Sequence, residues 1–298
     1  MLSGWIVLDK PVGLGSTQAV SAVKRALREA GQPKTKVGHG GTLDPLASGV
    51  LPIALGEATK LAGRMLDSTK AYDFTIRFGE ETDTLDAEGT AIATSIERPT
   101  LADIDAVLRR FTGEIEQVPP AYSALKVEGK RAYDLARAGE DVTLKARRIT
   151  VHSLFPLAAV PGVPLDEITL AASVSKGTYI RSLARDIARA LGTVGHVTML
   201  RRTRAGPFGL DKAISLDKLM EFAKARSLDE GVLPLEAGLD DIPALPVTPE
   251  QAALLRHGQQ LFGISAQAGL HLARTAETPV ALVEVAGGQV TVVRGFNI

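Results

Sequence analysis

Residues 70–79, KAYDFTIRFG, alternate from Tyr72 onward between aromatic or aliphatic side chains and polar ones. This period of two is typical of a half-buried β-strand, because successive side chains of a strand point to opposite faces. The pattern predicts a strand with one apolar face, formed by Tyr72, Phe74, Ile76 and Phe78. Tyr72 stands at the N-terminal end of this row. Its ring therefore either completes the core or lines a pocket, and the pattern alone leaves both open.

Further strands and helices are predicted on both sides of this segment. Apolar runs bounded by turn residues predict strands at 5–9, 50–56, 90–96, 149–154 and 168–174. Apolar residues at helical spacing predict helices that begin at an N-cap Ser16, at the capping pair Thr100 and Asp103, and within 175–181. Residues 245–249, LPVTP, are predicted to be a linker, and residues 250–298 a small β-rich unit with one helix.

The segment 38–49, GHGGTLDPLASG, has glycine or proline at five of its twelve positions. Proline disfavours the α region for the residue before it, so Asp44 is expected to be extended and accessible. A carboxylate with an ordinary pKa is an anion at neutral pH and can act as a nucleophile, a base or a charge partner. A turn aspartate in a glycine-rich loop is an equally good interpretation of these twelve residues alone.

Length and composition exclude several classes of protein. The 298 residues, 45% hydrophobic and 23% charged, are typical of a soluble globular protein with one large domain or two smaller ones. The sequence contains no cysteine, so disulfides and thiolate metal sites are excluded, and its five histidines lack metal-ligand spacing. Neither a signal peptide nor a long apolar run is evident. We expect a cytoplasmic protein without metal or cofactor.

The charges are unevenly distributed although the net charge is zero. Residues 121–212 carry 15 basic and 8 acidic side chains. A local excess of cations suits a phosphate-binding face, although a solvated surface is the ordinary alternative. Within this region, residues 117–141 combine two prolines, two tyrosines and several bases, which suits a segment that closes over a polyanion. A surface hairpin with a short helix is the alternative.

Arg181 is predicted to lie in the first turn of the helix that opens at 175–181. A cation there opposes the helix dipole, so an anionic partner such as Asp44 is expected. The sequence lacks the glycine-rich phosphate motifs GxGxxG and GxxxxGK[ST] and the GxSxG nucleophile motif. With these motifs excluded, the candidate functional groups are the carboxylate of Asp44, the guanidinium of Arg181 and the tyrosines. This set suits cofactor-free chemistry on a nucleobase of RNA, where the base leaves its stack and meets a catalytic side chain.

From residue 4 to about residue 215 the sequence resembles the bacterial tRNA pseudouridine-55 synthases, the TruB-type family. The resemblance rests on motifs that recur in order, at 4–11 with Gly13, 38–45, 70–72, 82–86, 117–126, 175–181 and 200–203. It implies an α+β fold, with a mixed, largely antiparallel central sheet flanked by helices and a small PUA-like C-terminal domain. It also implies isomerisation of uridine to pseudouridine at position 55, in the T-loop of tRNA, without cofactor or metal.

The resemblance further implies roles for individual residues. Asp44 would be the nucleophile, attacking either the uracil ring or the ribose anomeric carbon, with Arg181 as its ion-pair partner and Tyr72 stacked on the target base. The expected substrate-binding residues are His39, Tyr179, Leu200, Lys10, Lys126 and Lys176. Each has a plain structural alternative when taken singly, such as a surface cation or a core residue. Gly40 departs from many relatives, which have threonine there, and is expected to loosen the loop.

The expected organisation is a catalytic domain at 1–240, with an insertion at 121–150 that closes over RNA, and a PUA-like domain at 245–298. The expected partner is the T-stem-loop of tRNA, bound by a monomer with no obligatory protein partner and no membrane. A guide-RNA-directed synthase of the dyskerin type, and an RNA-binding module without isomerase activity, are the alternative functions.

Overall fold

The computed structural model describes residues 2–298 except 124, 128–129, 139–143, 159–160 and 277. One nine-stranded sheet contains half of the strands in the described residues. Its members are β1 (Gly4–Lys10), β2 (Val37–His39), β3 (Ser48–Leu55), β4 (Lys70–Phe78), β7 (Gly113–Gln117), β10 (Arg147–Ala158), β11 (Glu167–Val174), β12 (Gly195–Ala205) and β13 (Phe208–Gly209). Seven follow the order β1-β3-β12-β4-β11-β10-β7, while β2 pairs with β3 and β13 with β12.

The direction of the strands confirms the predicted sheet type. β3 and β12 run parallel where Arg201 pairs with Ser48, and the other neighbouring pairs of this sheet are antiparallel. The sheet is therefore mixed and largely antiparallel, as the resemblance implied. The parallel pair matters for the site because it places β12 beside the strand that follows the Asp44 loop.

β4 occupies the middle of this sheet, between β11 and β12. Phe74, Ile76 and Phe78 are buried, as the alternation of the sequence predicted, while Tyr72 is only partly buried. The first aromatic of the row, Tyr72, packs against the core and also lines a pocket at the start of β4.

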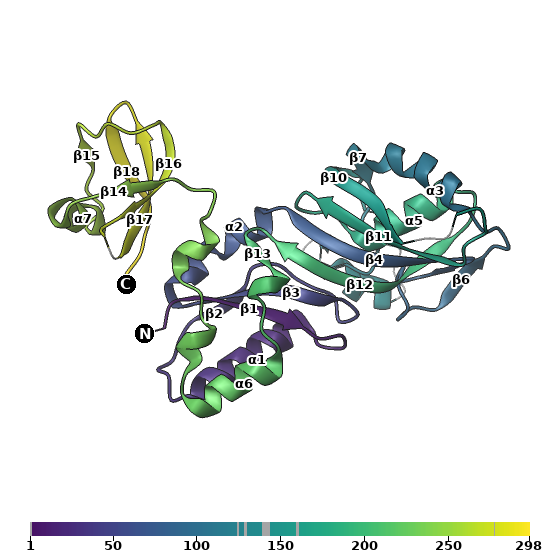
Figure 1. Cartoon of the computed structure of the whole chain (residues 1–298), viewed down its shortest axis with the longest axis horizontal. Helices are drawn as coiled ribbons and strands as arrows, with labels where there is room; N and C mark the ends of the chain where they lie inside the picture. The colour runs from purple at the N-terminus through teal and green to yellow at the C-terminus, as the bar shows by residue number, and fades with distance from the viewer. Residues whose placement is uncertain (1, 124, 128–129, 139–143, 159–160, 277) are drawn as a thin grey trace.

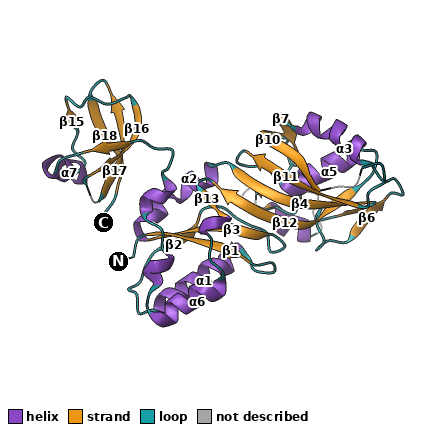
Figure 2. Cartoon of the chain, viewed as in Figure 1, coloured by secondary structure: helices purple, strands orange, loops and turns teal. Residues whose placement is uncertain are grey.

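Helices gather near the two ends of the sheet (Figure 1, Figure 2). α1 (Ser16–Glu29) and α6 (Leu216–Ala225) lie together near β1, while α3 (Leu101–Leu108) and α5 (Ile180–Ala190) lie together at the other end. Thr100 and Asp103 form the predicted capping box of α3. One core cluster joins the apolar faces of these helices to the sheet, with Val23, Ile104, Leu183 and Leu219 among its buried members.

Shorter elements complete the first part of the chain. They are the helix α2 (Ala62–Asp67), the hairpin of β5 (Glu80–Thr82) and β6 (Ala91–Thr94), and, within 121–150, β8 (Lys126–Val127), β9 (Lys130–Arg131) and α4 (Ala132–Arg137). Residues 124, 128–129 and 139–143 of the expected insertion lie outside the described residues. Across the part of the chain that the structure covers, no helix has both the length and the apolar character needed to cross a membrane.

A second sheet of five strands forms near the C-terminus, in the order β14-β16-β17-β18-β15. Its elements are β14 (Ala244–Pro246), α7 (Pro249–Arg256), β15 (Leu261–Phe262), β16 (Gly269–Arg274), β17 (Pro279–Ala286) and β18 (Gln289–Gly295). This finding confirms the small β-rich C-terminal unit. The linker predicted at 245–249 is wrong, because Leu245 is buried in β14 and Thr248 caps α7, with proline at the first helical position.

The two sheets are joined by polar and apolar contacts. Lys60 donates to the Gly295 carbonyl at 2.9 Å, and the Asn297 amide donates to Glu57 at 2.7 Å. One buried cluster contains Trp5 from β1 and Phe296 from the C-terminal end. The C-terminal unit is therefore attached through the 3-10 helix Gly56–Leu61 and through this shared cluster.

Candidate active site

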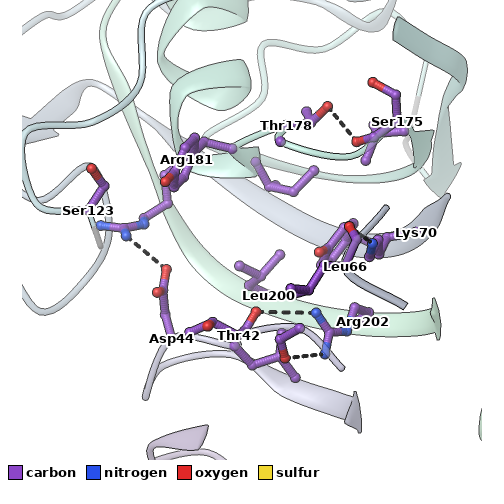
Figure 3. A pocket seen from close by; sticks show the side chains of 17 residues that line it. Thr42, Asp44, Leu66, Lys70, Ser123, Ser175, Thr178, Arg181, Leu200 and Arg202 are labelled. Atoms are coloured by element: carbon purple, nitrogen blue, oxygen red, sulfur yellow. Dashed lines mark hydrogen bonds and ion pairs between the residues drawn. The ribbon is translucent and has the colours of Figure 1, made fainter. Parts of the chain in front are cut away.

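Asp44 lies in the loop between β2 and β3, where it meets Arg181 from the first turn of α5. An Nη2–Oδ2 distance of 2.8 Å joins the two side chains (Figure 3). The Asp44 side chain is 39% exposed, whereas that of Arg181 is only 7% exposed. The ion pair predicted from the sequence is therefore present, with the carboxylate reaching the surface of a pocket and the guanidinium buried behind it.

The Arg181 guanidinium is fixed by several further groups. Its Nη1 lies 3.2 Å from Oδ2 of the buried Asp86 and donates to the Thr84 carbonyl at 2.8 Å, and its Nη2 donates to the Tyr122 carbonyl at 3.1 Å. A buried charge is tolerated when it is paired and hydrogen-bonded, so this set holds the guanidinium in one orientation. Sequence reasoning assigned no role to Asp86, although it stands within one of the quoted motifs.

Ser16 holds the backbone immediately before Asp44. Its hydroxyl donates to the Leu43 carbonyl at 2.9 Å and accepts from the Leu43 amide at 2.8 Å. The prediction that Ser16 is an N-cap is wrong, because Gly15 is the N-cap and Ser16 is the first helical residue. Serine is a residue type that often caps helices. In the folded chain, however, the Ser16 hydroxyl binds the amide and the carbonyl of Leu43 in the Asp44 loop.

Arg202 of β12 holds both ends of the same loop. Its guanidinium donates to the carbonyls of Val50 at 2.7 Å, Thr42 at 3.2 Å and Gly41 at 3.3 Å, and the side chain is almost fully buried. Gly49 pairs with Arg202 and has φ +100°, and a Cβ there would lie 2.1 Å from the Arg202 carbonyl oxygen. Glycine is therefore required where β3 leaves the loop.

Lys10 binds the loop from a third direction. It is fully buried, and its ammonium donates to the carbonyls of Leu14 at 2.6 Å, Pro11 at 2.9 Å and Pro45 at 3.4 Å. Burial lowers the pKa of Lys10 to about 8, although the nearby Asp44 charge acts in the opposite direction. The substrate-binding role expected for Lys10 does not fit this position, because its ammonium is enclosed by the protein's own carbonyls.

A pocket of about 300 Å³ opens beside Asp44. Tyr72 from β4, Leu200 from β12 and Tyr179 at the start of α5 form much of its wall. Gln117 holds Tyr179 by a pair of hydrogen bonds to its backbone, at 2.8 and 3.1 Å, and the Arg147 guanidinium lies 4.8 Å from the centre of the tyrosine ring. Two aromatic rings, an aliphatic wall and one carboxylate can hold a planar base next to a nucleophile.

The comparison with known proteins identifies the family. Residues 24–180 match the family described as TruB family pseudouridylate synthase (N terminal domain), and residues 181–240 match the tRNA pseudouridylate synthase B C-terminal domain. The first match alone spans more than half of the 298 residues. The chain belongs to the TruB pseudouridine synthase family.

Two curated TruB relatives are similar over nearly their whole length. The tRNA pseudouridine synthase B of Novosphingobium aromaticivorans is 62% identical over 300 residues, which cover 100% of this chain and 98% of that protein. The protein of the same name from Zymomonas mobilis subsp. mobilis is 62% identical over 296 residues, which cover 99% and 96%. A solved H/ACA RNP bound to a substrate RNA containing 2'-deoxyuridine has a chain with a TM-score of 0.74 and 27% identity, covering 99% of this chain and 85% of that one.

His39 lies at the edge of the TruB site and lines a cleft of about 710 Å³ together with Asp44 and Arg181. Its Nδ1 is buried and finds no hydrogen-bond partner among the described residues. Burial, and then the charge of Arg202, lower the pKa of His39 below its ordinary value, so the ring is neutral at pH 7. This nitrogen is buried, so a substrate group can reach it only after the ring turns.

Two lysines expected to bind substrate are placed less directly. Lys176 is exposed, forms an ion pair with Asp67 at 2.9 Å, and lines a neighbouring depression rather than the pocket that contains Asp44. Lys126 belongs to β8, but its side chain lies outside the described residues. Lys70, which sequence reasoning did not single out as a site residue, lines the pocket, and burial lowers its pKa to about 8.

Gly40 does not loosen the loop as expected. It is buried, its amide donates to the Pro52 carbonyl at 2.8 Å, and a Cβ there would lie 2.6 Å from Cβ of Met65. Because Gly40 has no side chain, Met65 of α2 packs closely against the loop.

Proposed function

We propose that this chain converts uridine to pseudouridine at position 55, in the T-loop of tRNA, with Asp44 as the nucleophile. Family membership and the 62% identity to proteins named tRNA pseudouridine synthase B support the reaction and the tRNA substrate. The observation that carries the residue assignment is the exposed Asp44 carboxylate, held by the buried Arg181 at the mouth of a pocket with two aromatic walls.

The reaction moves the ribose from a nitrogen to a carbon of the same base. The bond between ribose C1′ and uracil N1 breaks, a bond between C1′ and C5 forms, C5 loses a proton and N1 gains one. No net oxidation or reduction occurs, so the conversion needs no redox cofactor. Asp44 attacks either uracil C6 or ribose C1′, and both routes need the carboxylate ionised and facing the nucleoside.

The surrounding residues receive roles from their positions. Arg181 orients the carboxylate through the ion pair at 2.8 Å, and Tyr72 and Tyr179 enclose the detached ring while it turns. The target base must first leave the T-loop stack, and His39, which lines the cleft beside Asp44, is placed to contact the extruded nucleotide. Leu200 closes the apolar side of the pocket.

The wider organisation is also proposed. Residues 1–240 act as the catalytic domain, and residues 121–150 close over the T-stem-loop, supported by the contact of Tyr122 with Arg181 at the start of this segment. Residues 245–298 form the PUA-like unit. We propose a monomer that acts in the cytoplasm on free tRNA, without guide RNA or an obligatory protein partner.

The decisive experiment compares the wild type with Asp44→Asn on an unmodified tRNA transcript. Carbodiimide treatment and primer extension detect pseudouridine as a stop. We expect a stop at position 55 with the wild-type protein alone and none with Asp44→Asn, because the amide keeps the size of the side chain but is not a nucleophile. Asp105→Asn, an exposed carboxylate on α3, is the matched control and should retain full activity.

Near-wild-type turnover by Asp44→Asn would refute the assignment of the nucleophile. A requirement for added RNA or protein would favour the guide-directed alternative. Tight tRNA binding without any product would favour an RNA-binding module.

A further inference from the structure

A basic cavity, separate from the pocket beside Asp44, lies between α1 and the segment 32–37. It measures about 910 Å³. Four exposed cations line it, namely Lys24, Arg28, Lys34 and Lys36, and none of its lining residues is acidic. None of these four cations forms an ion pair with a residue in the described part of the chain. Glu57 interacts electrostatically with Lys36, but its ion pair is with Lys60 at 2.7 Å.

This arrangement differs from an ordinary solvated face in two respects. Lys24 and Arg28 are four residues apart on α1, where like charges lie on one side of the helix and destabilise it. The cations also surround a hollow whose lining includes the apolar residues Leu27, Pro33 and Val37. A concave cluster of one sign attracts a polyanion more strongly than scattered charges do.

Two elements lead from the Asp44 loop to this cavity. α1 begins at Ser16, which binds Leu43, and its later turns carry Lys24 and Arg28. β2 ends at His39 and is preceded by Lys34 and Lys36. A helix of 14 residues is about 20 Å long, so the cavity lies within the reach of one folded RNA whose uridine occupies the pocket.

We propose that Lys24, Arg28, Lys34 and Lys36 form a second RNA subsite, which binds the phosphodiester backbone of the same tRNA. The proposal rests on the proposed function for the identity of the RNA. The subsite anchors the substrate through charge, while the pocket beside Asp44 receives the reacting nucleoside. The shared chemistry is a phosphodiester, which either the T-arm or another part of the folded tRNA can supply.

The test measures RNA affinity as a function of KCl concentration. Arg28→Gln/Lys34→Gln is compared with Arg25→Gln/Arg110→Gln, which removes the same charge from exposed arginines that do not line the cavity. All proteins carry Asp44→Asn, so that no turnover occurs during filter binding. For the cavity variant we expect the dissociation constant to rise on the order of tenfold at low salt, and the slope of log K against log[salt] to fall by about 2.

Two RNAs distinguish the source of the phosphates. If the cavity variant loses affinity for full-length tRNA only, the bound phosphates belong to parts of the tRNA outside the T-arm. If it also loses affinity for the isolated T-arm hairpin, the phosphates belong to the T-arm. Equal affinities and equal slopes for the cavity variant and its control, with both RNAs, would overturn the proposal. Lys24→Gln/Lys36→Gln must reproduce the effect, which guards against a folding defect in one variant.

The activity and the subsite can fail separately. Pseudouridine formation by Arg25→Gln/Arg110→Gln with native Asp44 tests the reaction. An absence of product together with weakened binding by the cavity variant would refute the reaction and retain the subsite.

Discussion

At the scale of single residues, exposure separates the side chains placed for chemistry from those that hold them. Asp44 and Tyr72 are partly exposed at the pocket, whereas Arg181, Lys10 and Arg202 are buried and bind the protein's own oxygen atoms. Cations removed from water bind carbonyls and carboxylates strongly, so they fix the geometry of what they bind. Asp44, the proposed nucleophile, keeps an exposed side.

Tyr72 and Phe78 belong to the same row of β4, which allows a matched test. Tyr72→Leu should lower the single-turnover rate on the order of 100-fold with little loss of stability, because the ring that positions the base is gone. Phe78→Leu should retain the rate and lose about 1–2 kcal/mol of the free energy of unfolding, because its ring is buried. Rapid-quench kinetics and urea denaturation measure both quantities. Unfolding of Tyr72→Leu would assign this ring to the core instead.

Lys10 predicts a specific dependence of stability on pH. Its pKa is about 8 in the folded protein against an ordinary value of 10.5, so above pH 8 the folded state releases a proton that the unfolded state still holds. The unfolded state then binds more protons, and stability contributed by this group increases with pH until about 10.5. The free energy of unfolding of the wild type minus that of Lys10→Met should therefore rise by about 1–3 kcal/mol between pH 7.5 and 9.5. A constant or falling difference would contradict this assignment.

At the scale of elements, three parts of the fold meet at one loop. β1 contributes Lys10, α1 contributes Ser16 and β12 contributes Arg202, and each binds backbone atoms between Gly41 and Val50. Loops are commonly the mobile parts of a domain, but this one has hydrogen-bond partners on three sides. The elements therefore hold the loop of Asp44, the proposed nucleophile, in place.

Arg202 tests this role of β12. Arg202→Met should lower the catalytic rate constant by about 10-fold to 100-fold, while the affinity for tRNA stays within about twofold, because Asp44 loses its position and the RNA surface is unchanged. Single-turnover kinetics and filter binding give the two quantities. The neighbouring Arg201→Gln is the control, since Arg201 pairs with Asp9 at 2.8 Å and does not contact the backbone of the loop before Ser48. Equal losses of rate in both variants would show that β12 has only a general structural effect.

At the scale of the whole molecule, the second sheet shares a buried cluster with the first. Phe296 and Leu282 from the C-terminal part pack in the same cluster as Trp5 and Phe208. Surfaces that bury large side chains between two units couple their unfolding, whereas small polar contacts do not. The ion pair of Arg64 with Asp241 at 2.8 Å attaches the segment just before β14 to α2.

Phe296→Ala should reveal this coupling. The side chain is 1% exposed, so its truncation should cost about 3–5 kcal/mol of the free energy of unfolding and separate one thermal transition into two. Phe262→Ala is the control in the same sheet, because its ring is 72% exposed and its loss should change stability by less than about 1 kcal/mol. Calorimetry measures the number of thermal transitions and the loss of stability in both variants. A single unshifted transition for Phe296→Ala would mean that the two parts fold independently of this contact.

The sequence by itself determined the features that depend on local pattern. The alternation at 70–79 predicted β4, glycine and proline predicted an accessible Asp44, and the place of Arg181 in a first helical turn predicted a need for an anion. Periodicity and turn chemistry act over a few residues, so they can be read without the rest of the chain. The family resemblance supplied the sheet type and the reaction.

Only the tertiary structure decided which polar side chains became internal supports. Arg202 and Thr42 are 160 positions apart, and Ser16 and Leu43 are joined only when α1 and the loop approach each other. Local sequence made Ser16 a helix cap and residues 245–249 a linker, and the resemblance made Lys10 a substrate-binding residue. Burial and hydrogen-bond partners depend on which distant segments approach, and that information is present only in the folded chain.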